Sequence, residues 1–387
     1  MGVTAPKSSV PSSIPLSLPS VGRRETAAVL SALRHGALVG RGQIGLRLEK
    51  AMARDLGAKH VLLTTSGSHA LELAMAVLEL GPGDEVILPS FTFSSVANAV
   101  LRQKAKPVFC DVLEDTLNID PADAARRITK RTRAIIPVHY AGVACDMKAL
   151  RAIARPRRIA LVEDAAHAVG ASAGGKALGS IGAAGCMSFH ATKNVTCGEG
   201  GAFITSDDEL ARRAEWFREK GTNRSEFLRG EVRKYTWVSE GSSYVLSDLL
   251  ASVLEVQWAR RREINRERGV LYARYMERLA PLQSERRLRL PSIPAGCISS
   301  YHLFHILLPT KARRDRVQAA LRADGIGAAF HYQPLHASPF GRSLGRQPRL
   351  PVTESAADRL LRLPLYAGLK PAAVDRVCAR LEKAARA

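Results

Sequence analysis

The sequence contains no long apolar run. The longest stretches, residues 135–138 and 159–162, are far shorter than the roughly 20 residues that a transmembrane helix needs. No stretch near the start joins an apolar run to a small-residue cleavage site, so we expect no secretory signal peptide. These absences argue against a membrane or secreted protein and favour a cytoplasmic one.

Cysteine pairs are also missing. The cysteines are scattered along the chain, and none forms a Cys-x-x-Cys pair. Structural zinc sites and disulfide frameworks depend on close, regular cysteine spacing, so we expect neither a metal site nor a disulfide framework. The positions are Cys110, Cys145, Cys186, Cys197, Cys297 and Cys378.

Acidic residues are scarce relative to basic ones. The chain carries 57 Lys and Arg against 36 Asp and Glu, which gives a net charge of +21. Such an excess attracts polyanions, so a non-enzymatic nucleic-acid-binding protein is one interpretation. However, the arginines are spread along the chain, and the sequence shows no helix-turn-helix, zinc-finger or aromatic-rich basic strand. We therefore expect a solvated, Arg-rich surface and no nucleic-acid partner.

What is present is a regular alternation of short apolar runs with helix-like segments such as residues 70–80 and 121–129. Continuous apolar strands between helices are typical of a parallel sheet that is covered on both faces, so we expect an α/β domain. Its ligand site should lie beyond the carboxyl ends of the strands. The expected strands are residues 61–63, 85–88, 107–110, 134–138 and 159–163.

The 387 residues are enough for two domains. Residues 1–20 are rich in Ser and Pro and predict an N-terminal arm, and residues 21–56 have a helical pattern. We expect residues 21–250 to form the large α/β domain and residues 251–387 a smaller α+β domain. The expected elements of the smaller domain are a long helix at 252–279, a strand at 301–308, and helices at 313–324 and 372–386.

Residues 64–70 (TTSGSHA) follow an expected strand and open a helix. A helix start presents free backbone N–H groups and a partial positive charge, so it can bind a phosphate. Gly67 allows close approach of the phosphate, and Ser68 adds a hydroxyl. A plain helix N-cap would use the same residue types, and this motif alone leaves the two interpretations open.

Two further motifs follow later strands. Residues 162–167 (VEDAAH) end a buried strand with two acidic residues, and Asp164 could pair with a cationic ring nitrogen or could cap the next element. Residues 188–194 (SFHATKN) contain Lys193 and precede a Gly-rich stretch that allows a reversal into a strand at 202–205. Taken alone, Lys193 would be interpreted as a surface charge.

Together the three motifs are more specific. Lys193 lies 29 residues after Asp164, with a strand-like run at 185–189 between them. With residues 89–93 (PSFTF) and 331–336 (HYQPLH), this arrangement resembles the sugar aminotransferases of the DegT/DnrJ/EryC1/StrS family, from about residue 12 to the C-terminus. The resemblance implies a fold-type I transferase that depends on pyridoxal 5'-phosphate (PLP), with a large, mostly parallel-sheet domain and a smaller C-terminal α+β domain.

Three other strings resemble the branch of this family that makes dTDP-4-amino-4,6-dideoxyhexoses: residues 138–145 (VHYAGVAC), 218–225 (REKGTNRS) and 234–237 (KYTW). The resemblance implies that an amino acid supplies nitrogen to C4 of a dTDP-4-keto-6-deoxy sugar, and we expect this donor to be glutamate. Another PLP reaction on a nucleotide sugar, 3-amination or dehydration, stays open. Relatives that dehydrate their substrate carry His where this chain has Lys193, which argues against dehydration.

The resemblance also assigns roles to cofactor contacts. Lys193 would form a Schiff base with the cofactor aldehyde and would later move the proton, and Asp164 would keep the pyridinium nitrogen protonated. His167 would contact the ring hydroxyl, and Phe93 would stack on the ring. The residues expected to bind the phosphate are Gly67, Ser68 and Ser188.

A homodimer with shared active sites is implied as well. Ser243, in residues 241–245 (GSSYV), stands where many relatives have an Asn that reaches the cofactor phosphate of the partner subunit. The expected partners are therefore a second copy of the chain and the two substrates, with no membrane contact. The candidate contacts to substrate are Asn223, Arg224, His331, Tyr332 and His336.

Overall fold

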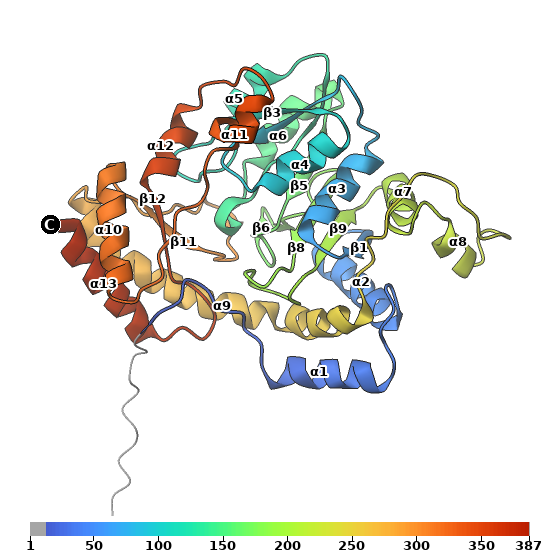
Figure 1. Cartoon of the computed structure of the whole chain (residues 1–387), viewed down its shortest axis with the longest axis horizontal. Helices are drawn as coiled ribbons and strands as arrows, with labels where there is room; N and C mark the ends of the chain where they lie inside the picture. Colours follow the sequence, from blue (N-terminus) through green and yellow to red (C-terminus); the bar gives the residue numbers. More distant parts are fainter. Residues whose placement is uncertain (1–12, 387) are drawn as a thin grey trace, which may run out of the picture.

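A central sheet organises the large domain of the computed structural model, which describes residues 13–386 (Figure 1). Its strands are β1 (His60–Thr64), β2 (Glu85–Pro89), β3 (Lys106–Cys110), β4 (Thr132–Ile135), β5 (Ala160–Asp164), β8 (Ala184–Ser188) and β9 (Gly201–Thr205). The order is β1-β9-β8-β5-β4-β2-β3, and only β9 runs antiparallel to its neighbours. The predicted α/β fold with a mostly parallel sheet is confirmed.

Helices cover both faces of this sheet, which explains why its strands are short apolar runs. They are α2 (Gln43–Leu56), α3 (Gly67–Val77), α4 (Ser94–Arg102), α5 (Pro121–Arg127), α6 (Met147–Ala154) and α7 (Asp208–Arg218). Alternate residues of β2 pack against the helices on opposite faces of the sheet. Val86 and Leu88 pack with α3 and α4, whereas Ile87 packs with α5 and α6.

The N-terminal region forms two helices where one helical pattern, residues 21–56, was expected. Helix α1 (Arg23–Arg34) ends before Gly36, whose φ of 66° interrupts the helix, and α2 begins at Gln43. Residues 1–12 of the predicted arm lie outside the described residues. In the remainder of the arm, Ile14 pairs with Ile326 and packs in the core of the smaller domain.

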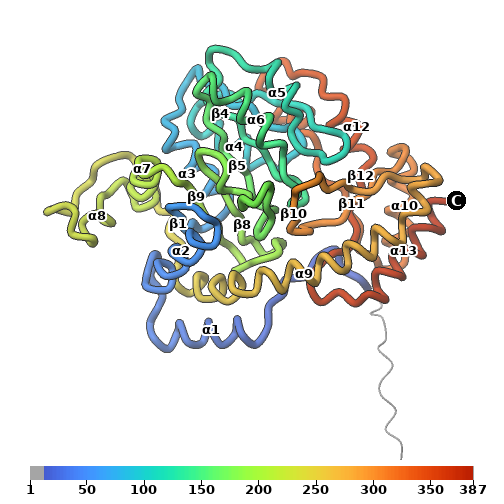
Figure 2. Tube along the Cα trace, turned by 180° about the vertical axis from the view of Figure 1, so that it is seen from behind, coloured from blue at the N-terminus to red at the C-terminus, as the bar shows by residue number. Residues whose placement is uncertain are grey.

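The smaller domain is built on helix α9 (Asp248–Ser284), which runs along both domains (Figures 1 and 2). Leu254 and Trp258 pack against the large domain, while Leu271 and Leu279 belong to the core of the smaller one. The predicted boundary at residue 250 therefore falls beside the start of a helix that both domains share. The other main elements are β11 (Phe304–Leu307), β12 (Leu360–Leu363), α10 (Lys311–Ala323), α12 (Pro351–Arg359) and α13 (Pro371–Arg386).

Short elements complete the chain. The helix α8 (Arg224–Leu228) and the loop after it project from the body of the large domain (Figures 1 and 2). The remaining elements are β6 (Ser172–Ala173), β7 (Lys176–Ala177), β10 (Cys297–Ile298), α11 (Pro339–Ser343) and the 3-10 turns η1 (Tyr140–Gly142), η2 (Arg155–Arg157) and η3 (Leu335–Ala337).

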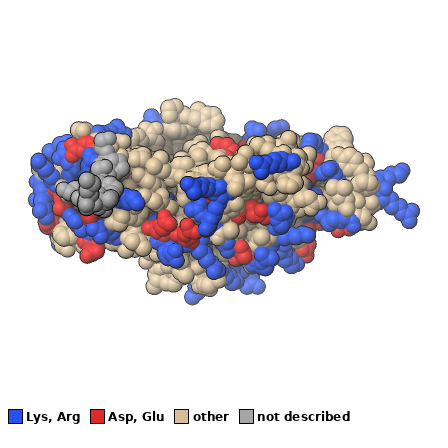
Figure 3. Space-filling model, turned by 90° about the horizontal axis from the view of Figure 1, so that it is seen from below, with Lys and Arg blue, Asp and Glu red and all other residues tan. Residues whose placement is uncertain are grey.

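The surface charge is mixed on the face seen in Figure 3, where Lys and Arg side chains are spread over the molecule with acidic side chains among them. Many arginines take part in ion pairs, such as Arg274 with Asp375 and Arg229 with Glu215. This spread is the one expected of a solvated, Arg-rich surface. Within residues 13–386, no helix combines the length and the apolar character that crossing a bilayer requires.

Candidate functional site

A cavity of about 460 Å³ opens beyond the carboxyl ends of β5 and β8, where the two domains meet. This is the place that a parallel sheet offers to a ligand. We call the large-domain side of this cavity the floor, and define it by Ser68, Asp164, His167, Ser188 and Lys193. We call the side contributed by the smaller domain the wall, and define it by His302, His331 and Arg362.

The two acidic residues at the end of β5 have different roles. Glu163 is fully buried and accepts hydrogen bonds from His139 Nε2 (2.9 Å), Gly179 N (2.8 Å) and Gly182 N (2.6 Å). Burial alone raises the pKa of this carboxyl, but the bonds from His139 and the backbone hold it below its usual value. Adjacent strand residues point to opposite sides, so Asp164 borders the cavity while Glu163 anchors a loop.

Asp164 is buried, and its Oδ1 accepts a hydrogen bond from Ala166 N at 3.0 Å. Burial raises the pKa of its carboxyl, while the Ala166 bond and the positive charge of Lys193 act in the opposite direction. A cationic group in the cavity would favour the ionised form further. The helix-cap interpretation and the ligand interpretation are therefore compatible, because Oδ1 caps the turn while the side chain borders the cavity.

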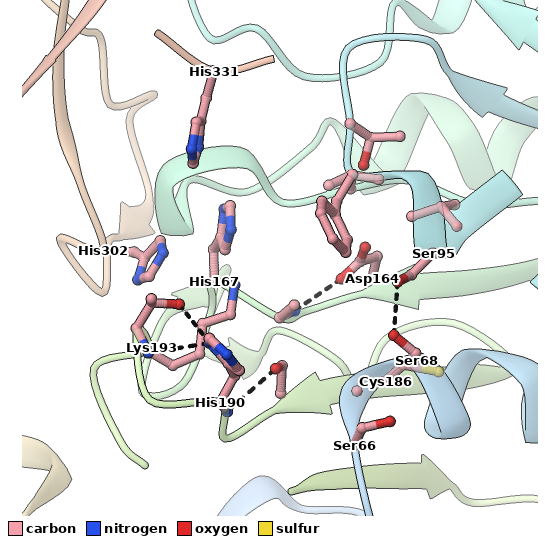
Figure 4. Close-up of a pocket in the computed structure, with 18 of the residues that line it drawn as sticks. Ser66, Ser68, Ser95, Asp164, His167, Cys186, His190, Lys193, His302 and His331 are labelled. Carbon is pink, nitrogen blue, oxygen red and sulfur yellow. Dashed lines mark hydrogen bonds between the residues drawn. The ribbon is translucent and has the colours of Figure 1, made fainter. Parts of the chain in front are cut away.

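Lys193 lies in the turn that follows β8, and its backbone N–H bonds His190 O at 2.9 Å. Its side chain lines the cavity opposite Asp164 (Figure 4). Burial is the main cause that lowers the pKa of this amine to about 8; the charge of Asp164 opposes the shift, and the guanidinium of Arg362 adds to it. The amine is therefore neutral to a large extent near pH 8, unlike that of an exposed lysine.

The residue after this lysine ties the floor to the wall. Asn194 donates from Nδ2 to Ser300 O at 2.7 Å, and its Oδ1 accepts a hydrogen bond from His302 Nδ1 at 2.9 Å. The ring of His302 stacks on His167 with centroids 4.1 Å apart (Figure 4). Burial, followed by the surrounding positive charges, keeps the pKa of both imidazoles well below the usual value, so both rings are neutral.

The N-terminus of α3 forms a second part of the floor. Ser66 caps the helix by accepting from His69 N at 3.0 Å, and Ser68 Oγ lies 2.7 Å from Ser95 Oγ. Any Cβ at Gly67 would lie 2.7 Å from Ser188 Cβ, so only glycine fits between α3 and β8. Phe93, 60% exposed, borders the same side of the cavity.

These features fit the cofactor that the resemblance implies. Free N–H groups at the start of α3, with Ser68 and Ser188 beside them, suit a phosphate. Asp164 suits a protonated ring nitrogen, and the Nδ1 of His167 is buried without a hydrogen-bond partner in the described chain, so it is available to a ring substituent. Lys193 supplies an amine that is neutral enough to react with an aldehyde.

The wall contains two residues that we did not predict, His302 and Arg362. Arg362 stands on β12 and donates from Nη1 to His331 Nδ1 at 2.8 Å. Burial, followed by the charge of Arg362, lowers the pKa of His331 to about 4, which keeps this ring able to accept the bond. Tyr332 also borders the cavity, so two predicted substrate contacts, His331 and Tyr332, lie in it.

Four predicted contacts lie outside the cavity of this chain and remain predictions. His336 is buried between Ser90 Oγ (2.7 Å) and Glu354 (3.3 Å). The side chain of Asn223 bonds to Lys234 O and Thr236 N. Arg224 pairs with Glu219 at 3.5 Å, and Ser243 is exposed.

Comparison with known proteins agrees with this geometry. An aminotransferase, TlmJ from Streptoalloteichus hindustanus, is 34% identical, with a TM-score of 0.89 over 96% of this chain and 98% of that one. Helicobacter pylori PseC, an aminotransferase involved in the biosynthesis of pseudoaminic acid, is 26% identical, with a TM-score of 0.88 over 97% and 99%. A Streptococcus pneumoniae protein solved in a PLP form is also 26% identical, with a TM-score of 0.90 over 97% and 99%.

The profile of one protein family matches residues 19–382, which is nearly the whole chain. That match includes both domains and every residue of the floor and the wall. The aminotransferases of this family use PLP, in agreement with the amine, carboxylate and phosphate-binding groups of the floor. The chain therefore belongs to the DegT/DnrJ/EryC1/StrS aminotransferase family and is a PLP-dependent transaminase.

Proposed function

We propose that this chain moves an amino group from glutamate to C4 of a dTDP-4-keto-6-deoxy sugar and so makes a dTDP-4-amino-4,6-dideoxyhexose. The main support for amino transfer is that Lys193, with a pKa of about 8, lies in the same cavity as Asp164. The sugar assignment rests on the strings at residues 138–145, 218–225 and 234–237. The cavity volume, about 460 Å³, lies within the range usual for small-molecule sites.

Lys193 is the proposed attachment point for the cofactor and the proposed base. At pH 8 about half of an amine with a pKa of about 8 is neutral, against roughly 1% or less for an ordinary lysine. A base works best when its pKa lies near the working pH. With a donor in the cavity, Lys193 Nζ would take the proton from the carbon that bears the amine of the donor.

The other floor residues prepare the site. PLP, when bound, supplies a ring that withdraws electrons from the substrate carbon. Asp164 would hold the proton on the ring nitrogen, and His167, kept neutral by burial, would hydrogen-bond the ring hydroxyl. Phe93 would lie against the ring, and Gly67, Ser68 and Ser188 would hold the phosphate. Because donor and acceptor use one cavity, the amino acid must leave before the sugar enters.

The test is incubation of the PLP-loaded chain with glutamate and dTDP-4-keto-6-deoxyglucose, with the product identified by NMR. We expect nitrogen at C4 of the hexose, and no product with the Lys193→Ala variant. Nitrogen at C3, or a product that has lost water without gaining nitrogen, would assign a different reaction to the same fold. A parallel incubation with a 3-keto isomer of the sugar is the control that distinguishes amination at C4 from amination at C3.

We also propose that the chain works as a homodimer with shared sites. The projecting segment around α8 exposes large apolar side chains, and Trp237 (76% exposed) and Leu228 (62%) are the most exposed. Large apolar side chains gathered on one exposed segment are typical of a protein interface. Ser243 is exposed beside α3, on a segment held by Tyr244, whose hydroxyl bonds Glu72 at 2.7 Å. A second copy would cover the apolar patch and receive Ser243 near its own phosphate-binding groups.

A mixing experiment tests this assembly. The Lys193→Ala and Ser243→Asp variants are each expected to be weakly active or inactive. If sites are shared, a mixed dimer has one site with both defects and one intact site, so activity should return after subunit exchange. A monomer in sedimentation at micromolar concentration, or no recovery after proven exchange, would contradict the shared site.

A further inference from the structure

The described part of the N-terminal arm, residues 13–20, borders the cavity, although the proposed function gives it no role. Two of its residues, Leu16 and Ser17, lie in the cavity lining. The arm is anchored on both sides of them. Ile14, before them, is buried in the core of the smaller domain, and the carbonyl oxygen of Ser20, after them, accepts a hydrogen bond from α9 at 2.7 Å. The two lining residues are therefore held in place at the cavity.

The smaller domain is shaped to receive this arm. Gly327 donates from its N–H to Ile14 O at 2.7 Å, and Leu16 O accepts from Leu365 N at 3.2 Å. A Cβ at Gly327 would lie 2.6 Å from Leu16 N, so a larger residue at this position would displace the arm. The φ of Gly327 is outside the left-handed region, so the close approach of the arm, and not the backbone conformation, requires glycine here.

Leu16 differs chemically from the wall, which carries a guanidinium and two imidazoles. The other aliphatic side chains larger than alanine in the cavity lining are at most 6% exposed and belong to the core of the large domain; they are Leu71, Val96 and Val138. Leu16 is only partly buried. Among residues 13–386, it is therefore the large aliphatic side chain of the lining that a substrate can most readily contact.

The two proposed substrates differ in the apolar groups that they bring into the cavity. Glutamate carries a charged group at each end of a short chain. A 4-keto-6-deoxy hexose carries a methyl group on C5, the carbon next to the reacting carbonyl, so this methyl enters the cavity together with the carbonyl. Burial of a methyl against a leucine is favourable, whereas a hydroxyl in its place would lose water without gaining a partner. An accessible leucine therefore suits the 6-deoxy sugar.

We propose that Leu16 packs against the C6 methyl of the acceptor sugar and makes the chain prefer 6-deoxy hexoses to hexoses with a hydroxyl on C6. This inference rests on the proposed function, because it needs a sugar acceptor that carries the methyl. Gly327 is a positioning residue, since it sets the place of Leu16 without touching the substrate. The arm then helps to determine which acceptor the chain uses.

The test follows the sugar half of the reaction in reverse, starting from stable amino sugars. The PLP-loaded chain is mixed with dTDP-4-amino-4,6-dideoxyhexose or with dTDP-4-amino-4-deoxyhexose, which has a hydroxyl on C6, each in both C4 configurations. The loss of PLP absorbance gives the rate. We expect the unaltered chain to favour the 6-deoxy sugar. The Leu16→Ala variant should lose roughly tenfold with that sugar and change little with the 6-hydroxy sugar.

The arm offers a matched control. Leu18→Ala alters a leucine of the same arm that is 51% exposed and outside the cavity lining, and it should behave like the unaltered chain. Gly327→Ala displaces the arm and should weaken the preference without changing any lining side chain. Gly81→Ala is the control for that variant, because no atom lies within 4 Å of its added Cβ. The PLP absorbance and the melting temperature of each variant report cofactor loading and folding.

Equal rates of the unaltered chain with the two sugars, or equal losses for both in Leu16→Ala, would overturn the inference. A loss with glutamate as large as the loss with the 6-deoxy sugar would also overturn it, because Leu16 would then act on the donor or on the cofactor.

A failure of the proposed function gives a different result. The corresponding 3-amino sugars, with and without the C6 hydroxyl, are tested in parallel. If only these sugars react, the C4 position is wrong, and a preference for the 6-deoxy sugar that falls in Leu16→Ala still supports the role of Leu16. If the unaltered chain reacts with none of the amino sugars, both the proposed function and the role of Leu16 are rejected.

Discussion

The floor and the wall of the cavity face each other but carry opposite kinds of group. The floor contains the carboxylate of Asp164 and a lysine whose amine is partly neutral. It also includes a helix N-terminus and the hydroxyls of Ser68 and Ser188. The wall has a guanidinium and two neutral imidazoles, and it contributes no carboxylate to the lining. The floor is therefore suited to a cofactor with a cationic ring and a phosphate, and the wall to an anionic substrate.

The difference follows from how each side is built. Floor residues stand at the ends of strands of one sheet, where backbone geometry brings them together. Wall residues come from a separate domain, joined through α9 and through bonds such as that of Asn194 with Ser300. One scaffold can therefore keep the cofactor site constant while changes in the smaller domain alter the substrate.

The largest expected effect is on the floor, with Lys193→Ala. Removing the amine takes away both the attachment point and the base, so turnover should fall on the order of 10⁴-fold or more. The near-visible PLP absorbance should also be lost, which Arg362→Gln in the wall should not cause. Turnover assays and an absorbance scan measure these effects. Lys176→Ala, at an exposed lysine of β7, is the control. Retained turnover in purified Lys193→Ala would refute the assignment of the floor.

Asp164→Asn is expected to have the next largest effect. Asn keeps an oxygen for Ala166 N but removes the anion that would hold the ring nitrogen protonated. The loss of one preorganised electrostatic contact costs on the order of 10²–10³ in rate, so turnover should drop by that factor while some PLP remains bound. Steady-state kinetics and PLP titration test both parts. Near-normal turnover would mean that Asp164 serves only as a cap.

Gly67→Ala sharpens the comparison within the floor. The added Cβ would lie 2.7 Å from Ser188 Cβ, so α3 and β8 must separate at the place proposed for the phosphate. Overpacking of this kind costs about 1–3 kcal/mol, and we expect roughly tenfold weaker PLP binding by absorbance titration. Gly81→Ala is the matched control, because no atom lies within 4 Å of its added Cβ. Equal PLP affinities of the two variants would exclude Gly67 from the phosphate site.

The smallest expected effect is a pH dependence. Only the neutral amine of Lys193 captures PLP, and burial lowers its pKa to about 8. The capture rate of the cofactor-free chain should therefore be low below this pH, rise through about pH 8 and level off above it. Stopped-flow absorbance measures this profile. Arg362→Gln removes a positive neighbour and should shift the midpoint upward. A midpoint near 10.5, the value for an unperturbed lysine, would show that the cavity does not enclose the amine.

The sequence predicts the floor better than the wall, for physical reasons. The floor follows from one rule, that polar residues directly after buried parallel strands meet at one edge, and from the order Asp164, Lys193. Arg362 is far from both in sequence, and its placement depends on the packing of the smaller domain. The available signal was a single arginine inside a run of leucines, where an unpaired charge is unfavourable without a function. His302 has no comparable signal.

Contacts between domains also limit the prediction of the fold. The alternating pattern predicts β1, β2, β3, β4 and β5 to within a few residues, because burial on both faces imposes apolar runs. It does not show that α9 crosses from one domain to the other. Likewise, His336 belongs to a predicted substrate motif, yet it lies buried against Ser90, a contact that only tertiary packing determines.

The most direct test of the central claim, that the floor holds the cofactor through Lys193, is chemical. The PLP-loaded chain is treated with borohydride, which makes the link between cofactor and amine permanent, and is then digested and analysed by mass spectrometry. We predict the cofactor mass on the peptide that contains Lys193 and on no other lysine. The same peptide should carry it in Arg362→Gln, because the wall does not hold the cofactor. Attachment to a different lysine, or no attachment in a chain that still transfers amino groups, would contradict the account.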